Sequence, residues 1–309
     1  MRVYRVVIAL VVVAVFGWTL GRIDWQTVLA QLAGARPAPL ALAVVLVLVP
    51  LGLRSTRARG LLREVGHADI PFSRVAPITV FGFSMSSLTP AGSGDLLRVE
   101  ALRPWGVAPP LSAAVVVYER LLDLLVMATL LAVALVATWL PAPHAAGVLL
   151  VAAGGVALLA LLYRRRRLDL GAWIARLPAA PRAWFPEPAA AQVLFEPRVL
   201  GRALATTTFV FLTEALRPWL VLMSLGLEPG FFACWAIFTL AWLAGVASLL
   251  PLGIGSWETA AVWAFSLYGI GPSEGAAGAV LLRAGVTLPA ILLGLLSLVW
   301  LRRKAEGQP

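Results

Sequence analysis

Two acidic residues and two arginines stand at matched spacings in this apolar sequence. Asp95 precedes Arg120 by 25 residues, and Glu258 precedes Arg283 by the same 25 residues. A carboxylate and a guanidinium attract each other strongly away from water, and an arginine can also hold a phosphate through two parallel hydrogen bonds. These residue types therefore favour either an ion pair that fixes the local structure or a site for an anionic headgroup.

The segments that precede the two acids share a pattern. Residues 87–94 read Ser-Leu-Thr-Pro-Ala-Gly-Ser-Gly, and residues 248–255 read Ser-Leu-Leu-Pro-Leu-Gly-Ile-Gly. Further along, residues 105–109 match residues 268–272 in register with the acids and the arginines. We interpret this recurrence as an internal duplication.

Each copy predicts a helix that breaks inside the membrane. Proline and glycine permit such a break and let another backbone or a ligand come close. A helix that starts after the break aims its N–H groups at an anion, and the acid at that point is expected to cap it. Packing glycines and caps without any ligand are the alternative interpretation. The residues of the two breaks are Pro90, Gly92, Gly94, Pro251, Gly253 and Gly255.

The composition predicts a membrane protein. Of the 309 residues, 61% are hydrophobic and 13% are charged, which is too apolar for a soluble domain. Several apolar runs are long enough to cross a bilayer as helices. We expect one all-α integral membrane domain over residues 1–309, with repeat-like halves at about 39–140 and 199–301 and an interfacial cytoplasmic linker at 164–198. The six expected spans cover about residues 6–20, 39–53, 112–140, 145–163, 199–225 and 275–301.

Basic residues predict the orientation, because cytoplasmic loops of membrane proteins are rich in arginine and lysine. The N-terminus, residues 54–74, the linker together with the nearby Arg202, and the C-terminus hold 18 of the 25 basic residues. Placing them in the cytoplasm makes residues 75–110 a re-entrant hairpin from the cytoplasmic face, and residues 231–271 one from outside. Two opposed hairpins form an inverted repeat, an arrangement in which transporters place a substrate site at mid-membrane.

Charged residues inside the expected spans and hairpins are candidates for that site, since charges in a bilayer need a partner or a wet cavity. Glu119 and Asp123 are one helical turn apart and share a face. The candidate substrate-binding residues are Asp95, Arg98, Glu119, Arg120, Asp123, Glu214, Arg217, Glu258 and Arg283.

Other chemistries find little support in the sequence. Ser84 follows Gly-Phe as in an intramembrane serine protease, but no histidine lies in a later span to activate it. Cys234 is the single cysteine and both histidines fall in expected loops, so no metal centre or other cofactor is expected. The net charge of +10 belongs to segments between spans, which argues against nucleic acid. The apolar N-terminus is expected to remain as an uncleaved helix.

Three motifs carry a resemblance to a known family: residues 90–98, residues 118–123, which read Tyr-Glu-Arg-Leu-Leu-Asp, and residues 251–258 followed by Arg283. Over essentially the whole chain, the sequence resembles the flippase-like membrane domain of the lysylphosphatidylglycerol synthase family. The resemblance implies lipid translocation. Family members that synthesise aminoacylated lipid carry a soluble transferase domain after the membrane part, so that activity is not expected of a chain that ends at Pro309. Asp95 stands where the family often has glutamate.

We therefore expect a non-enzymatic transporter of the cell (inner) membrane, with both termini cytoplasmic. Its partners would be membrane lipids, with a phospholipid, an aminoacyl-phospholipid and a polyprenyl-phosphate lipid as open alternatives. The competing hypothesis is a non-transporting accessory subunit that scaffolds a lipid or cell-envelope biosynthetic enzyme. A homo-oligomer is compatible with either.

Overall fold

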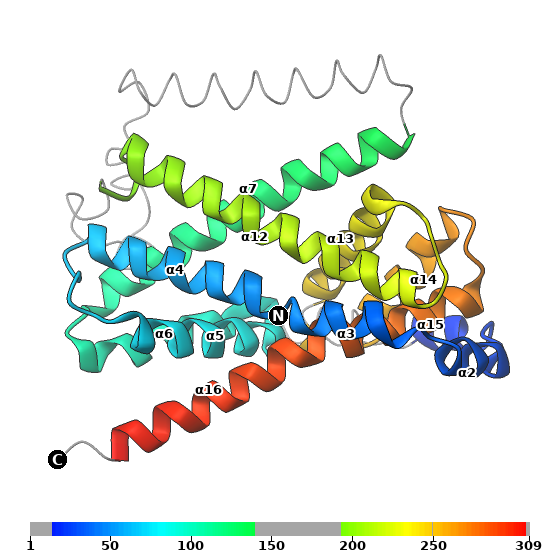
Figure 1. Ribbon diagram of the computed structural model, residues 1–309, viewed down its shortest axis with the longest axis horizontal. Helices are drawn as coiled ribbons and strands as arrows, with labels where there is room; N and C mark the ends of the chain where they lie inside the picture. The colour runs from blue at the N-terminus through cyan, green and yellow to red at the C-terminus, as the bar shows by residue number, and fades with distance from the viewer. Residues whose placement is uncertain (1–13, 140–192, 249, 307–309) are drawn as a thin grey trace. The chain divides into compact units, whose positions relative to one another are not determined.

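The chain is an all-α, multi-pass membrane protein. The computed structural model describes residues 14–139, 193–248 and 250–306, and these contain helices and no strand. Figure 1 shows the order of the elements along the chain. The α-helices are α2 (Trp25–Ala33), α3 (Pro37–Val45), α4 (Leu48–Glu64), α5 (Phe72–Leu88), α6 (Leu97–Leu102), α7 (Pro109–Trp139), α12 (Pro197–Ser224), α13 (Phe231–Ala247), α14 (Ser256–Ser266), α15 (Pro272–Leu282) and α16 (Leu288–Glu306). Short 3₁₀ or π segments are η1 (Pro90–Leu96), η2 (Arg103–Trp105), η3 (Pro251–Gly253) and η4 (Arg283–Thr287).

Four helical segments of the described chain are long and apolar enough to cross a membrane: Pro37–Glu64, Pro109–Thr138, Pro197–Ser224 and Pro272–Arg303. They correspond to four of the six expected spans. The fourth expected span, at 145–163, and most of the first lie outside the described residues, as does most of the expected linker at 164–198. The described chain also contains the short helix α2, and α13 is a shorter apolar helix.

The second span differs from the sequence-based prediction. Its helix does not end near Leu53 but continues as α4 to Glu64, so residues 54–64 are helical. A break separates α3 from α4, because the Pro50 ring would clash with the carbonyl of residue 46 in a continuous helix. At this break the backbone N–H groups of Val47 and Val49 donate to the carbonyls three residues earlier, those of Val44 and Leu46.

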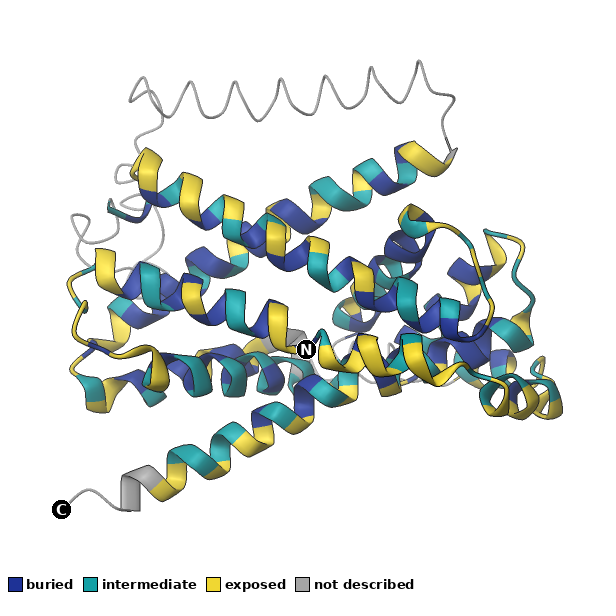
Figure 2. Ribbon diagram, viewed as in Figure 1, coloured by how far each residue is buried: buried dark blue, intermediate teal, exposed yellow. Residues whose placement is uncertain are grey.

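The described chain forms two compact units. The first contains the residues up to Pro50, residues 80–95 and those from Leu212 onward, and the second contains residues 51–79 and 96–211. In both, the long helices carry a buried stripe and an exposed stripe (Figure 2). On α7, Leu121, Leu124 and Leu125 are exposed while Glu119 and Asp123 are buried. This polar-inside pattern fits a helix that faces lipid.

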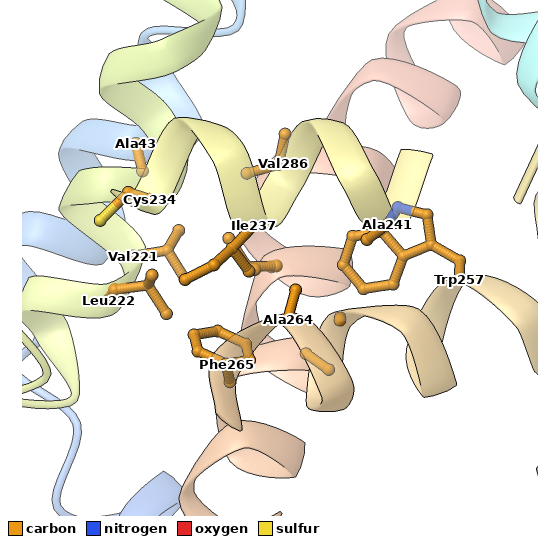
Figure 3. Packing of buried hydrophobic residues seen from close by; sticks show 13 residues of the cluster. Ala43, Val221, Leu222, Cys234, Ile237, Ala241, Trp257, Ala264, Phe265 and Val286 are labelled. Carbon is orange, nitrogen blue, oxygen red and sulfur yellow. The ribbon is translucent and has the colours of Figure 1, made fainter. Parts of the chain in front are cut away.

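Small residues allow close helix packing in the first unit. α13, α14 and α15 pack together, with Phe265, Ile237 and Trp257 among the side chains of the core (Figure 3). A Cβ added to Gly278 on α15 would come within 2.8 Å of the Phe265 ring. Close approach of helices over small residues is the usual packing mode within membranes, where lipid is as apolar as the side chains.

Helices α5 and α13 end directly before the two expected breaks. A Cβ on Gly94 would collide with the Met85 backbone, and one on Gly253 would lie 2.5 Å from the Gly245 Cα. Pro90 and Gly92 lie in η1, while Pro251 opens η3. At both positions, therefore, a glycine after the break lies against the end of the helix before it.

Candidate functional site: an arginine–carboxylate network and a second ion pair

The second unit buries a network of arginines and carboxylates, which we define as Arg54, Arg57, Arg98, Glu119, Arg120 and Asp123. Arg54 and Arg57 are three residues apart on α4, and Glu119 and Asp123 are four residues apart on α7. Both spacings place the two side chains on one helix face. The facing stripes of α4 and α7 therefore bring two cations against two anions.

Asp123 and Arg57 form the centre of the network. Arg57 Nη1 donates to Asp123 Oδ1 at 2.6 Å and to the Thr207 hydroxyl at 2.6 Å, and Arg57 Nε donates to Glu119 Oε1 at 3.2 Å. Arg54 Nη1 donates to Asp123 Oδ2 at 2.6 Å. The Arg54 guanidinium also lies 5.4 Å from the centre of the Phe211 ring. These short charge-assisted bonds hold α4, α7 and α12 together.

Arg98 and Arg120 extend the network in two directions. Arg98 on α6 donates to Glu119 Oε2 at 2.6 Å, and its side chain is 5% exposed. Arg120 Nη1 lies 3.6 Å from Asp123 Oδ2, and its side chain is 33% exposed. Arg120 is thus the most accessible of these four arginines, and its contact with Asp123 is the longest. It lies eleven residues into α7, which is about 16 Å from the start of the helix at 1.5 Å per residue.

Sequence reasoning missed Arg54 and Arg57 as site residues. It counted them as basic residues of a cytoplasmic segment, whereas both lie on α4 with less than 6% of the side chain exposed. Their three-residue spacing could have identified them, because residues three or four apart on a helix share a face, as Glu119 and Asp123 do. A search for long apolar runs does not show this spacing, because the run is taken to end at the first arginine.

The first unit contains an ion pair between Glu258 and Arg283, which was one of the two alternatives for these residues. Arg283 Nε donates to Glu258 Oε1 at 2.8 Å, and Glu258 Oε2 accepts the backbone N–H of Gly255 at 2.8 Å. Glu258 therefore satisfies the start of α14, as expected, and holds Arg283 as well. The guanidinium lies 4.3 Å from the centre of the Trp257 ring, and about a fifth of the Arg283 side chain is exposed.

A strained residue faces the same arginine. Leu252 has φ +57°, the only non-glycine residue with positive φ in the described chain. Its carbonyl accepts from Arg283 Nη2 at 2.7 Å. Left-handed backbone costs a residue with a Cβ roughly 1–2 kcal/mol, so strained positions of this kind often mark functional sites.

Arg217 is bound by backbone carbonyls. Its Nε donates to the Ala43 carbonyl at 3.0 Å, and its Nη2 donates to the carbonyls of Gly285 and Val286 at 3.2 and 2.8 Å. The last two belong to the π segment η4, where the helical hydrogen bonds are rearranged. All the described hydrogen bonds of Arg217 therefore join α12 to α3 and η4.

The remaining candidates are placed differently from the expectation. Asp95 is 2% exposed, but it does not cap the next helix: Leu96 is the N-cap of α6, and no side chain caps that helix. The reason is that η1 runs directly into α6 and leaves no turn for a cap. Glu214 on α12 is half-buried. Within the described chain, no three histidine, cysteine or acidic side chains gather as a metal site would require.

Comparisons with known proteins agree on one family. The family model described as "Lysylphosphatidylglycerol synthase TM region" matches residues 3–294. A UPF0104 membrane protein of Methanothermobacter thermautotrophicus is 27% identical over 278 residues, which cover 81% of each chain. A UPF0104 membrane protein of Methanocaldococcus jannaschii is 27% identical over 108 residues, or 35% of this chain and 32% of the relative. Because the family model spans nearly the whole sequence, this chain belongs to the family of the lysylphosphatidylglycerol synthase transmembrane region.

Proposed function

We propose that the protein moves an anionic phospholipid, or another lipid that carries a phosphate, between the leaflets of the cell membrane. It does so without covalent chemistry. Both termini lie in the cytoplasm, and the two hairpins enter from opposite faces toward a polar cavity at mid-membrane. The name of the family refers to a lipid synthase, which supports a lipid as the substrate.

The observation that carries the proposal is the arginine–carboxylate network on membrane-spanning helices. Charged groups in a bilayer are costly to keep, and they tend to mark the path of an ion or a substrate. Here carboxylates hold the arginines until a second anion arrives. Arg120 is the natural first contact, because it is the most exposed of the network's arginines and its ion-pair distance to Asp123, 3.6 Å, is longer than those of Arg54 and Arg57.

The second pair suggests how the other leaflet is served. Arg283 has one carboxylate, one carbonyl and an aromatic face as partners, and part of its side chain is exposed. An arriving phosphate can replace Glu258 while Trp257 and the Leu252 carbonyl keep the guanidinium in place. The inverted repeat gives the two sites opposite orientations, so loss of either one should stop net movement.

Lipid exchange by two arginine variants tests the proposal. The purified protein, Arg120→Lys and Arg283→Lys are reconstituted into vesicles, and the movement of labelled lipids between leaflets is followed across a broad lipid panel. Lysine keeps the charge but lacks the planar fork that binds two phosphate oxygens. We expect each variant to lose most of the exchange, by roughly tenfold or more, if one hydrogen bond to phosphate worth ~1.4 kcal/mol is lost.

The control is thermal stability, which should be unchanged in both variants. Full exchange by both variants would mean that the arginines only pin the structure. Absence of exchange by the parent protein with every lipid would instead support the accessory-subunit hypothesis.

A further inference from the structure

A cavity of about 150 Å³ lies between α4 and α12 in the second unit. Arg57, Gly60 and Glu64 line it from α4, and Arg202 lines it from α12. α4 ends at Glu64, and Arg202 lies in the second turn of α12, so one end of the cavity lies where both helices have their polar ends. The other end reaches the arginine–carboxylate network through Arg57.

Arg57 lines the inner end of the cavity. Its Nε and Nη1 are occupied by Glu119, Asp123 and Thr207, and its Nη2 has no partner among the described residues. The side chain is 3% exposed, so this nitrogen belongs to a buried cation held in place by its other bonds. A guanidinium fixed in this way is preorganised for an anion, because little conformational freedom remains to be lost on binding.

An ion pair closes the outer end. Arg202 Nη1 lies 3.1 Å from Glu64 Oε1, and the two side chains are 70% and 34% exposed. Ion pairs this exposed to solvent are weak, so an arriving anion can take Arg202 from Glu64. The Thr206 hydroxyl beside them donates to the Arg202 carbonyl of its own helix. The two arginines therefore supply the charged donors of the cavity.

The dimensions suit a small anion. Glu64 and Arg57 are seven residues apart on α4, or about 10 Å along the helix. The volume admits a phosphate with a small substituent, and it is below the ~300–1,000 Å³ of pockets that enclose drug-sized ligands. Leu61 and Val199 contribute apolar lining.

We propose that this cavity is the loading site for the phosphate group of the substrate. Arg202 captures the phosphate at the outer end by releasing Glu64, and Arg57 Nη2 receives it at the inner end, next to the network. The role in transport rests on the proposed function, whereas the binding of phosphate does not. The chemistry is common to a lipid headgroup and to a soluble phosphate, and the experiment separates these two sources.

Gly60 offers a variant that fills the cavity without touching a charge. A Cβ at Gly60 would meet no atom within 4 Å, so Gly60→Leu extends into open space. Gly201→Leu is the matched control, because Gly201 is exposed on α12, has the same free surroundings and does not line the cavity. Binding is measured by thermal stabilisation of the purified protein in detergent at constant ionic strength. The probes are inorganic phosphate and dihexanoyl phosphatidic acid.

We expect the parent and Gly201→Leu to bind at least one probe and Gly60→Leu to bind it roughly tenfold more weakly or not at all. Glu64→Gln should bind more tightly, because Arg202 no longer has a competing carboxylate. Binding of phosphatidic acid alone would assign the site to lipid, and binding of both probes would include soluble phosphate. No binding by the parent, or equal binding by Gly60→Leu and the parent, would overturn the proposal. If Gly60→Leu loses binding and the parent moves no lipid, the binding site stands and the proposed transport fails.

Discussion

Asp123 is shared among several cations. One carboxylate oxygen accepts from Arg57, the other accepts from Arg54, and Arg120 lies 3.6 Å away. The Asp123 side chain is 7% exposed, so little water is available to solvate the arginines in place of the carboxylate. A buried ion pair adds little net stability over an apolar pair, but removal of one partner leaves the other charge buried and uncompensated. The carboxylate is therefore needed because the arginines are there.

Replacement of Asp123 should consequently destabilise the second unit. Asp123→Asn keeps the shape and one acceptor but removes the charge that compensates Arg54 and Arg57. We expect a loss of about 3–5 kcal/mol in the free energy of unfolding, measured by titration with sodium dodecyl sulfate in mixed micelles. Glu100→Gln is the control, because its pair with Arg103 is exposed and should contribute about 0–1 kcal/mol. Equal effects of both substitutions would contradict the central role of Asp123.

Among the elements, the second break combines two constraints on one glycine. Gly253 has φ +59°, and a Cβ there would lie 2.5 Å from the Gly245 Cα and 3.0 Å from its carbonyl carbon. Backbone atoms cannot move away as a flexible side chain can. The contact therefore requires glycine for space as well as for conformation.

A pair of alanine substitutions separates the two constraints. Gly269 also has positive φ, +76°, but a Cβ there would meet nothing within 4 Å. Gly269→Ala should therefore cost only the conformational term of about 1–2 kcal/mol. Gly253→Ala should cost more, because α13 and η3 must also separate. The measurement is the same unfolding titration. A Gly253→Ala variant as stable as Gly269→Ala would show that the break does not depend on this contact.

Sequence patterns predict elements better than they predict contacts between elements. The recurring proline and glycine pattern predicted both breaks, because these residues determine the local backbone. The spacing of Glu258 and Arg283 offered an ion pair as one of two alternatives, and the pair is present in the described chain. Arg217 shows the opposite case: its partners are carbonyls made available in η4, and no spacing in the sequence shows that a π segment forms there.

For the whole molecule, the orientation of the first hairpin is a prediction that labelling can test. In a Cys234→Ser background, Ala108→Cys and Ile270→Cys report on positions near the ends of the two hairpins. A membrane-impermeant thiol reagent should label Ala108→Cys only from the cytoplasmic side and Ile270→Cys only from outside, because the predicted inverted repeat would place them on opposite faces. Labelling of Ala108→Cys from outside would contradict the re-entrant assignment.

The carboxylate of Asp123, shared by Arg54 and Arg57, also limits the order in which substitutions at these positions can be accepted. A lineage that loses Asp123 first must tolerate two buried cations, and one that loses Arg54 and Arg57 first must tolerate a buried anion. Replacement of all three by apolar residues avoids both penalties, yet it requires several substitutions at once. Effects of residues in such contact do not add, so the fitness of each substitution depends on the others. We therefore expect the three positions to change together or not at all, whatever the protein does.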